Sequence, residues 1–345
     1  MLNIFKRKQK QTEYSSLKQK YYDEAKEIAK INDLSPTQID ELISNNADVD
    51  YLKEEIKSFF TKPDIQFLKE KFCLKNIKEN RNDVSVEDVV FGTSAGDIIG
   101  SKYEFSEHET VESIFSENLF STDDTALSFA TLEAIKENPE NPDFQKAYLA
   151  AYNKNKDAGY GSSFISWTTN NEHKPYGSCA NGCLMRISAI PAFYQDYNKM
   201  IDIAIKSTMT THNSIEAVKA TIIFATCIWM AINQYSKTEI FEYCKQYYDY
   251  SDNVLQNKIM LYKPYKFSDK IIYQKEISKD SLFAGYALPM AIDHFYHTSC
   301  FEDCAVEILN SFCDSDTICA MVGGLWCAFC GNLGFDIRKF VEKYS

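Results

Sequence analysis

One apolar segment near the C-terminal end of the chain constrains the fold more than any other feature. Residues 318–329 are apolar on every face of a helix, so a helix formed there has to lie in the centre of the protein. Gly323 and Gly324 within this segment would let another helix approach closely, although each glycine weakens the helix itself. The segment therefore predicts a core helix with other helices packed around it.

The sequence from about residue 86 onward has the same helical character. Ile215, Val218, Ile222 and Trp229 mark one long helix after Asn213. No alternating run of convincing strand length appears, and 12 Gly and 8 Pro in 345 residues argue against turn-rich all-β architectures. Residues 245–280 have little periodicity, which predicts a short helix followed by a long surface loop. We predict an all-α fold.

The first part of the chain predicts a separate helical unit. A capping box at residues 35–38 predicts a short helix over residues 36–44, and a second apolar pattern at helical spacing runs over residues 49–59. Neither pattern carries residues of obvious chemical use. We divide the chain into a helical N-terminal extension, residues 1–85, and a main domain, residues 86–345.

The charge distribution excludes one class of partner. Residues 1–85 hold 16 Lys and Arg against 15 Asp and Glu, so the overall net charge of −12 comes from residues 86–345. An acidic main domain repels a phosphate backbone, and nucleic-acid binding has no electrostatic support.

The cysteines and the hydropathy pattern indicate a cytoplasmic protein that does not span a membrane. No apolar stretch of signal-peptide length stands at the N-terminus, and we expect no 18-residue uncharged run to span a membrane. Eleven cysteines in such a chain are expected as reduced thiols. Residues 300–304 and 327–330 have the spacings C-x3-C and C-x-x-C, but both lie in apolar helical patterns, which favours core packing over zinc binding.

Two short acidic segments stand directly before apolar helical patterns. Residues 122–125 read Thr-Asp-Asp-Thr, and residues 314–317 read Asp-Ser-Asp-Thr before the central apolar segment. Either segment alone is explained as a helix N-cap with acidic residues in the first turn. The two together favour another role, because the second precedes a helix so apolar that its carboxylates are drawn toward the interior.

Carboxylates in the interior need compensating charge, and no run of Lys or Arg near either segment supplies it. Carboxylate and hydroxyl oxygens without His or Cys are hard ligands, which favour Mg²⁺ or Mn²⁺ over Ca²⁺ and over zinc. The two acidic segments therefore predict a metal site.

Six segments, in this order along the chain, resemble the ADP-ribosylglycohydrolase family, which includes the dinitrogenase reductase-activating glycohydrolase. They are residues 96–105 (GDIIGSKYEF), 121–125 (STDDT), 157–167 (DAGYGSSFISW), 175–186 (PYGSCANGCLMR), 210–218 (TTHNSIEAV) and 314–317 (DSDT). The resemblance spans about residues 90–331. It implies an all-α, orthogonal multi-helix bundle with a dinuclear Mg²⁺ centre in a cleft, where Mn²⁺ is the alternative ion.

The resemblance also implies roles for individual residues. Thr122, Asp123 and Asp124 would bind one ion. Asp314 and Thr317 would bind the other, and Asp316 would serve both. The implied catalytic residues are Glu104, Asp123 and Asp316, with Glu104 positioning or activating water. The loops that embrace ADP-ribose would contribute Gly159, Tyr160, Gly161, Ser178, Asn181, Gly182 and His212, while Arg186 would buttress its loop.

The sequence departs from the family pattern at two places. Phe312-Cys313 stands where the family usually has two glycines before its D-x-D-T segment, and the family's glycine-rich loop reads Cys-Ala-Asn-Gly-Cys over residues 179–183. The bulkier residues could narrow the cleft or alter the second metal position. They put the substrate range in doubt, while the metal ligands themselves are retained.

The sequence leaves three functions open. The first is an enzyme that removes ADP-ribose from a modified protein, with arginine-linked ADP-ribose favoured. The second is a toxin-immunity or inhibitor protein that binds an ADP-ribosyltransferase through residues 1–85, with or without hydrolase activity. The third is another dinuclear hydrolase that acts on a phosphorylated small molecule.

Overall fold

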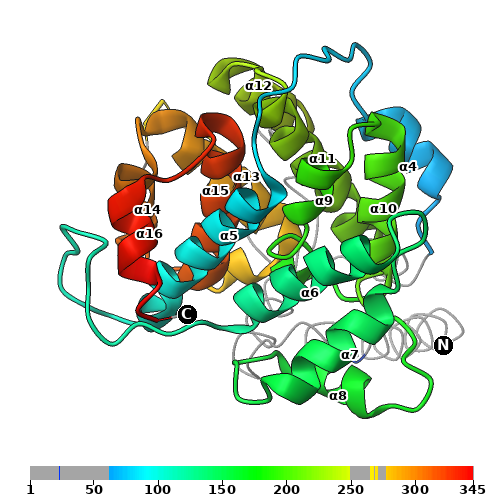
Figure 1. The fold of residues 1–345 in the computed structure, drawn as a ribbon, viewed down its shortest axis with the longest axis horizontal. Helices are drawn as coiled ribbons and strands as arrows, with labels where there is room; N and C mark the ends of the chain where they lie inside the picture. Colours follow the sequence, from blue (N-terminus) through cyan, green and yellow to red (C-terminus); the bar gives the residue numbers. More distant parts are fainter. Residues whose placement is uncertain (1–22, 24–61, 249–264, 268, 271–276, 345) are drawn as a thin grey trace, which may run out of the picture.

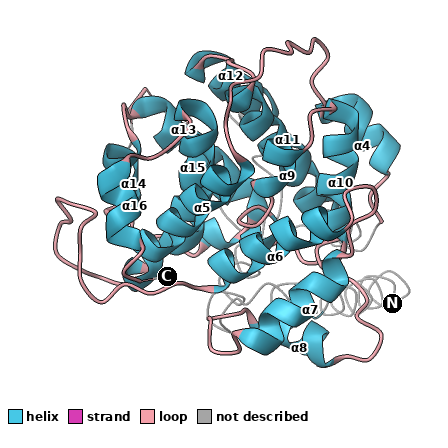
Figure 2. Cartoon of the chain, viewed as in Figure 1, coloured by secondary structure: helices cyan, strands magenta, loops and turns pink. Residues whose placement is uncertain are grey.

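The computed structural model describes residues 23, 62–248, 265–267, 269–270 and 277–344. These residues form thirteen α-helices and three short 3₁₀ helices with no strand among them, so the predicted all-α fold is confirmed (Figures 1 and 2). The α-helices are α4 (Ile65–Phe72), α5 (Val86–Gly100), α6 (Asp123–Glu137), α7 (Phe144–Lys154), α8 (Ser162–Thr169), α9 (Ala189–Phe193), α10 (Tyr197–Met209), α11 (Ile215–Ile232), α12 (Lys237–Tyr248), α13 (Ala284–His297), α14 (Phe301–Leu309), α15 (Ser315–Cys330) and α16 (Phe335–Val341). The 3₁₀ helices are η1 (Ser101–Tyr103), η2 (Asn181–Cys183) and η4 (Asp280–Leu282).

Helices α5 and α15 lie against each other in the middle of the molecule (Figure 1). Gly92, Gly96 and Gly100 lie four residues apart on α5 and therefore share one face of that helix. A Cβ atom on any of the three would collide with the backbone of α15, and a Cβ on Gly323 would collide with the Gly92 carbonyl oxygen. The predicted close approach of another helix at Gly323 is confirmed, and glycine makes it possible.

The two most apolar helices form the core, as predicted. Residues 315–328 of α15 are all buried, and α11 begins after the N-cap residue Ser214. By length and composition α11 could cross a membrane, because its mean hydropathy is 1.7, but 83% of it is buried inside the protein. The surrounding helices account for this apolarity, so α11 is the core helix of a globular fold.

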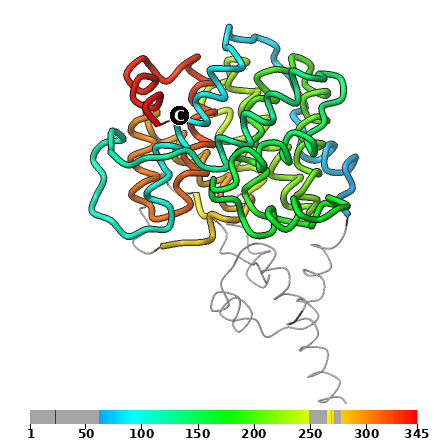
Figure 3. The backbone as a smooth tube through the Cα atoms, turned by 60° about the horizontal axis from the view of Figure 1, so that its bottom comes forward, coloured from blue at the N-terminus to red at the C-terminus, as the bar shows by residue number. Residues whose placement is uncertain are grey.

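The connection between α5 and α6 packs along the C-terminal helices (Figure 3). The backbone N–H of Val111 donates to Asn310 Oδ1 at 2.9 Å, and the rings of Phe115 and Phe340 meet edge to face at 5.0 Å. These contacts hold the middle of the connection, which leads to the start of α6.

Residues 62–85 also contact the main body. The side chains of Leu68 and Phe72 on α4 are buried, and α4 packs against α11. The backbone N–H groups of Leu74 and Asn82 donate to Tyr197 Oη and to the Ile232 carbonyl, both at 2.8 Å. The boundary at residue 85 stays a prediction, and the helices expected over residues 36–44 and 49–59 lie outside the described residues.

Two local expectations have different outcomes. The short helix predicted from residue 245 is the end of α12, while most of the surface loop predicted up to residue 280 lies outside the described residues, and at its end Ser278, Lys279 and Asp280 are half-buried. All eleven cysteines are free thiols, as expected. Cys304 and Cys327 pack in the core, Cys300 is half-buried, and Cys330 is exposed.

Candidate active site

The N-terminal ends of α6 and α15 converge on one buried acidic centre. Thr122 caps α6 in the ordinary way, since its Oγ1 accepts the Asp124 N–H at 3.3 Å. Asp314 stands at the N-cap of α15, but its side chain makes no capping hydrogen bond. Its Oδ2 instead accepts a hydrogen bond from Asn181 Nδ2 at 2.6 Å. Helix capping thus explains the first acidic segment in part and fails to explain the second.

Asp97, which the sequence analysis did not single out, organises this centre from α5. Its side chain is fully buried, and its carboxylate accepts hydrogen bonds from the Thr122 N–H at 2.9 Å and Oγ1 at 2.7 Å. It also accepts from the N–H and Oγ1 of Thr125. The signal for it was a lone acid between Gly96 and Gly100 in an otherwise apolar helix.

The carboxylates form two overlapping groups. Oxygen atoms of Asp97, Asp124 and Asp316 all lie within 4.8 Å of one another, and so do those of Glu104, Asp314 and Asp316. Asp316 belongs to both groups, which agrees with the shared role expected for it. Asp123 belongs to neither group, although its side chain lines the same cavity.

Because these acids are desolvated and lie close together, their pKa values are raised. Burial, with a smaller contribution from Glu104, raises the pKa of Asp314 to about 7. Glu104 lies at the rim and stays solvent-exposed, yet partial desolvation and the nearby Asp316 carboxylate raise its pKa to about 7. Burial first, and then the charges of neighbouring aspartates, hold the pKa values of Asp123, Asp124 and Asp316 well above the ordinary range of an aspartate. Such a group of acids requires either protons or cations.

The donor atoms fit a divalent metal ion. Asp124 Oδ1 is buried and has no hydrogen-bond partner among the described residues. Among the described residues, no Lys or Arg forms an ion pair with any of these carboxylates. Oxygen ligands of this kind are those that hard divalent cations prefer.

A cavity of about 410 Å³ opens over the acidic centre. The predicted site residues that line it are Glu104, Thr122, Asp123, Asp124, Gly159, Gly161, Ser178, Asn181, Gly182, His212, Asp314, Asp316 and Thr317. These residues come from six separate segments of the chain, so the fold brings together nearly all of the predicted site residues.

Tyr160 is the predicted site residue that does not line the cavity. Its ring stacks on Phe164 at 5.1 Å and meets Tyr152 edge to face at 5.2 Å. Its hydroxyl is buried without a hydrogen-bond partner among the described residues. The two flanking glycines therefore border the cavity while the tyrosine side chain packs beneath the loop.

The wall of the cavity next to Asp314 is built from residues 178–186 and residues 278–283. Asn181 Nδ2 donates to the Ser281 carbonyl at 2.9 Å as well as to Asp314. Ser281 Oγ accepts the Asp314 N–H at 2.9 Å, and Ser214 Oγ donates to the Ser178 carbonyl at 2.8 Å. Residues 278–283 were missed from the sequence because their contacts are with residues far away along the chain.

Arg186 does more than support its loop, which is the role expected for it. It supports its surroundings by donating to Thr211 Oγ1 at 2.7 Å, and it also lines the cavity. The sequence offered no signal for this second contact.

The departures from the family pattern point away from the cavity. Phe312 has a positive φ of 47° and stacks on His108 at 4.9 Å, while Cys313 is fully buried. Neither residue lines the cavity, and neither do Cys179 and Cys183. Among the bulkier residues only Ala180 and Asn181 reach it, so the expected narrowing of the cleft is confined to these two side chains.

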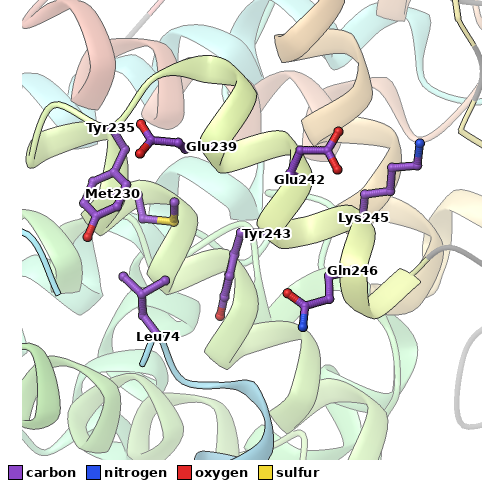
Figure 4. A pocket seen from close by; sticks show the side chains of 8 residues that line it. All are labelled: Leu74, Met230, Tyr235, Glu239, Glu242, Tyr243, Lys245 and Gln246. Atoms are coloured by element: carbon purple, nitrogen blue, oxygen red, sulfur yellow. The ribbon is translucent and has the colours of Figure 1, made fainter. Parts of the chain in front are cut away.

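A second hollow, of about 630 Å³, lies between α11, α12 and Leu74, and none of these acids lines it (Figure 4). Its polar side chains are already engaged: Glu239 forms an ion pair with Lys78, and Tyr243 Oη donates to the Phe72 carbonyl. Among the described residues that line it, no group of acids lies close enough together to hold a metal ion.

Known proteins resemble this chain in sequence and in fold. A putative ADP-ribosyl glycohydrolase, L543, from Acanthamoeba polyphaga mimivirus is 22% identical over 293 residues, which cover 73% of this chain and 89% of that protein. The ADP-ribosylhydrolase ARH3 of Homo sapiens is 25% identical over 185 residues, 44% of this chain, and the match spans 50% of ARH3. A solved structure titled ADP-ribosylglycohydrolase-related protein complex shares the fold, with a TM-score of 0.56 at 18% identity over 74% of this chain and 94% of that one.

The sequence model of a whole family matches most of the chain. That family is ADP-ribosylglycohydrolase, and the match runs over residues 79–338. It includes both acidic segments, Asp97 and every wall of the cavity. The chain therefore belongs to the ADP-ribosylglycohydrolase family, whose members are hydrolases that remove ADP-ribose.

Proposed function

We propose that this protein removes ADP-ribose from arginine side chains of modified proteins, with two Mg²⁺ ions bound in the acidic centre. One observation carries the proposal: two groups of carboxylates share Asp316 at the base of a cavity. The cavity volume of about 410 Å³ falls in the range of about 300–1,000 Å³ that is typical of small-ligand sites.

Each carboxylate group would hold one ion. Asp124 and Asp316, with the hydroxyls of Thr122 and Thr317 beside them, would bind the first, and Asp314 and Asp316 would bind the second, with Glu104 beside it. Divalent ions held there would supply Lewis acidity toward the hydroxyl oxygens of the terminal ribose. Asp97 sets the position of Thr122 and Thr125 through its hydrogen bonds.

The rim residues would handle the proton and the leaving group. Glu104 is solvent-exposed and has a pKa of about 7, so near neutral pH it can accept a proton from water and return it. Asp123, whose side chain is half-buried in the same cavity, adds a second acid. An acidic rim complements the cation of a guanidinium group, which supports arginine as the modified residue.

Hydrolysis of defined linkages tests the proposal. We expect release of ADP-ribose from an arginine-linked substrate with Mg²⁺, its loss with chelator, and its recovery on adding Mg²⁺ or Mn²⁺. Faster release from serine-linked ADP-ribose would correct the linkage and keep the enzyme class. No release from either substrate with either ion would overturn the proposed activity.

The alternative of an immunity protein that binds an ADP-ribosyltransferase rests on residues 1–85. Residues 1–22 and 24–61 lie outside the described part of the chain. The described remainder, including α4, packs on the main body through Leu68 and Phe72. No contact in the structure favours this second function over hydrolysis.

A further inference from the structure

Arg186 is a fully buried cation in the cavity wall. Its side chain is 1% exposed, and its guanidinium lies over the ring of Tyr148 at 4.2 Å from the centroid. Nη2 donates to Thr211 Oγ1 at 2.7 Å, while Nε has no hydrogen-bond partner among the described residues. The guanidinium is therefore held in place without using all of its donors.

The charge of Arg186 has no carboxylate partner. None of the ion pairs between described residues includes it, although the acidic centre borders the same cavity. Burying a charge without a counter-ion is costly, and the face of an aromatic ring offsets only part of the cost. An anion entering this side of the cavity would supply the missing partner.

Thr211 connects Arg186 to His212. Thr211 Oγ1 lies 2.7 Å from Arg186 Nη2 and 2.7 Å from His212 Nδ1. Arginine has no acceptor, so the hydroxyl oxygen must accept from it, and the single hydroxyl proton is then free to point toward Nδ1. The reverse arrangement, with a proton on Nδ1, leaves the buried hydroxyl proton without an acceptor and is disfavoured roughly tenfold or more.

This network determines where the imidazole proton sits. With Nδ1 as the acceptor, the proton of a neutral His212 lies on Nε2. Burial, and secondly the charge of Arg186, lower the pKa of His212 well below its ordinary value, so the ring stays neutral. A Cβ on Gly182 would lie 3.5 Å from Nε2, which places this nitrogen beside the glycine of the cavity loop.

We infer that Arg186 and Thr211 are positioning residues that hold His212 as an Nε2–H donor for an anionic oxygen of the substrate. Resting on the proposed function, that oxygen belongs to the pyrophosphate of ADP-ribose. The cavity then has two chemically distinct sides: carboxylates at the metal-binding end, and a neutral donor backed by an unpaired cation at the other. These two sides would orient ADP-ribose, because its negative charge lies on the pyrophosphate in the middle of the molecule.

The tautomer is tested by nitrogen NMR of the protein labelled with ¹⁵N-histidine, with the His212 signals assigned from the variant His212→Gln. We expect a protonated Nε2 and an unprotonated Nδ1 in the unmodified protein. Thr211→Ser keeps the hydroxyl and should keep this tautomer. Thr211→Val removes the hydroxyl and should give a mixture or the Nδ1–H form.

Binding of ADP-ribose, measured by calorimetry with Mg²⁺, tests the consequence. Thr211→Val and Arg186→Met should weaken binding about tenfold to a hundredfold, as expected for hydrogen bonds to a charged group, and Thr211→Ser should restore it. The matched control is Thr226→Val on α11, because Thr226 is equally buried and bonds to Tyr197 Oη at 2.8 Å away from the cavity. That variant should lose stability and keep both the tautomer and the affinity.

An Nδ1–H tautomer in the unmodified protein would overturn the inference. So would a Thr211→Val variant that binds ADP-ribose as well as Thr226→Val does. Failure of the proposed function would look different: the unmodified protein would release no ADP-ribose from any substrate, while the NMR result for His212 would stand by itself.

Discussion

Asp314 and Asp316 hold their places in the acidic centre through different bonds. Asp314 is fixed by Asn181, whereas Asp316 accepts the Thr317 N–H at 2.8 Å and joins both carboxylate groups. We expect Asp316→Ala and Asp314→Asn to lower the rate of ADP-ribose release by more than about a hundredfold. Replacing a residue that only supports a metal ligand already lowers metal affinity or activity by up to about a hundredfold. Turnover at fixed Mg²⁺ measures this.

The control for these variants is Asp143→Asn, which changes an exposed N-cap aspartate of α7 and leaves the cavity untouched. The far-ultraviolet circular dichroism of all three variants should match that of the unmodified protein. Full activity of Asp316→Ala at ordinary Mg²⁺ would show that these carboxylates do not bind the metal.

Glu104 is placed to handle a proton at the rim of the cavity. Glu104→Gln keeps the size and the hydrogen-bonding capacity of the side chain but removes its basicity, so kcat should fall by about 10²–10⁴ while ADP-ribose affinity changes little. The neighbouring exposed Glu107→Gln is the matched control and should leave kcat unchanged. Equal rates for both variants would make Glu104 an ordinary surface residue.

The acidic centre should also make the metal-free protein sensitive to pH. The pKa values of Asp314 and Asp316 are raised in the fold, so between about pH 4 and 7 the folded state keeps protons that the unfolded chain has released. Stability contributed in this way is complete below the unfolded pKa of about 4 and is lost as the pH rises toward 7. The melting temperature in chelator should therefore fall over this range.

Two comparisons check the origin of that pH dependence. Added Mg²⁺ should raise the melting temperature more at pH 7 than at pH 5, because deprotonated carboxylates bind it. The variant Asp316→Asn should show a shallower fall in chelator. A melting temperature that rises with pH in chelator, in parallel for both proteins, would contradict the assignment.

At the scale of helices, the crossing of α5 and α15 determines where Asp97 lies. A methyl group at Gly96 would collide with the Cys319 backbone, which cannot move aside as a side chain can. We expect Gly96→Ala to lower the free energy of unfolding by about 1–3 kcal/mol, although alanine favours an isolated helix by about 1 kcal/mol. Activity should fall as well, since Asp97 lies next in sequence.

Gly324→Ala provides the graded comparison on the opposite helix. Its Cβ would lie 2.5 Å from Thr93 Oγ1, a side-chain atom that can rotate away. Urea unfolding should therefore show a smaller loss for Gly324→Ala than for Gly96→Ala. An increase in stability for Gly96→Ala would mean that the two helices are not in backbone contact.

At the scale of the whole molecule, the described residues before α5, residues 62–85, pack against the main domain. Removing residues 1–85 would remove Leu68 and Phe72, each of which contributes about 1.5–3 kcal/mol by burial. A chain of residues 62–345 should therefore fold and hydrolyse substrate, while residues 86–345 should melt at a lower temperature or aggregate. Equal stability of the two truncations would show that α4 contributes nothing to the core.

Much of the fold follows from local sequence, and most of the site follows from the resemblance of six short segments to a known family. The apolar periodicity of residues 215–232 and 315–330 identifies the core helices, because a helix that is apolar all round must be buried. The two acidic segments mark a metal site because they lack any nearby basic partner. Thirteen of the fourteen predicted site residues line one cavity, and Tyr160 alone among them is turned into an aromatic cluster.

The remaining features depend on contacts between residues far apart along the chain. Asp97 joins the centre because glycines on α5 let that helix touch α15, and the wall at residues 278–283 exists because Ser281 bonds to Asp314. Arg186 faces the cavity because Thr211 and Tyr148 hold its guanidinium there. The sequence by itself determined which helices form and which acids gather. Only the tertiary structure decided which buried polar groups remain without partners, because hydrogen bonding and desolvation are set by neighbours in space.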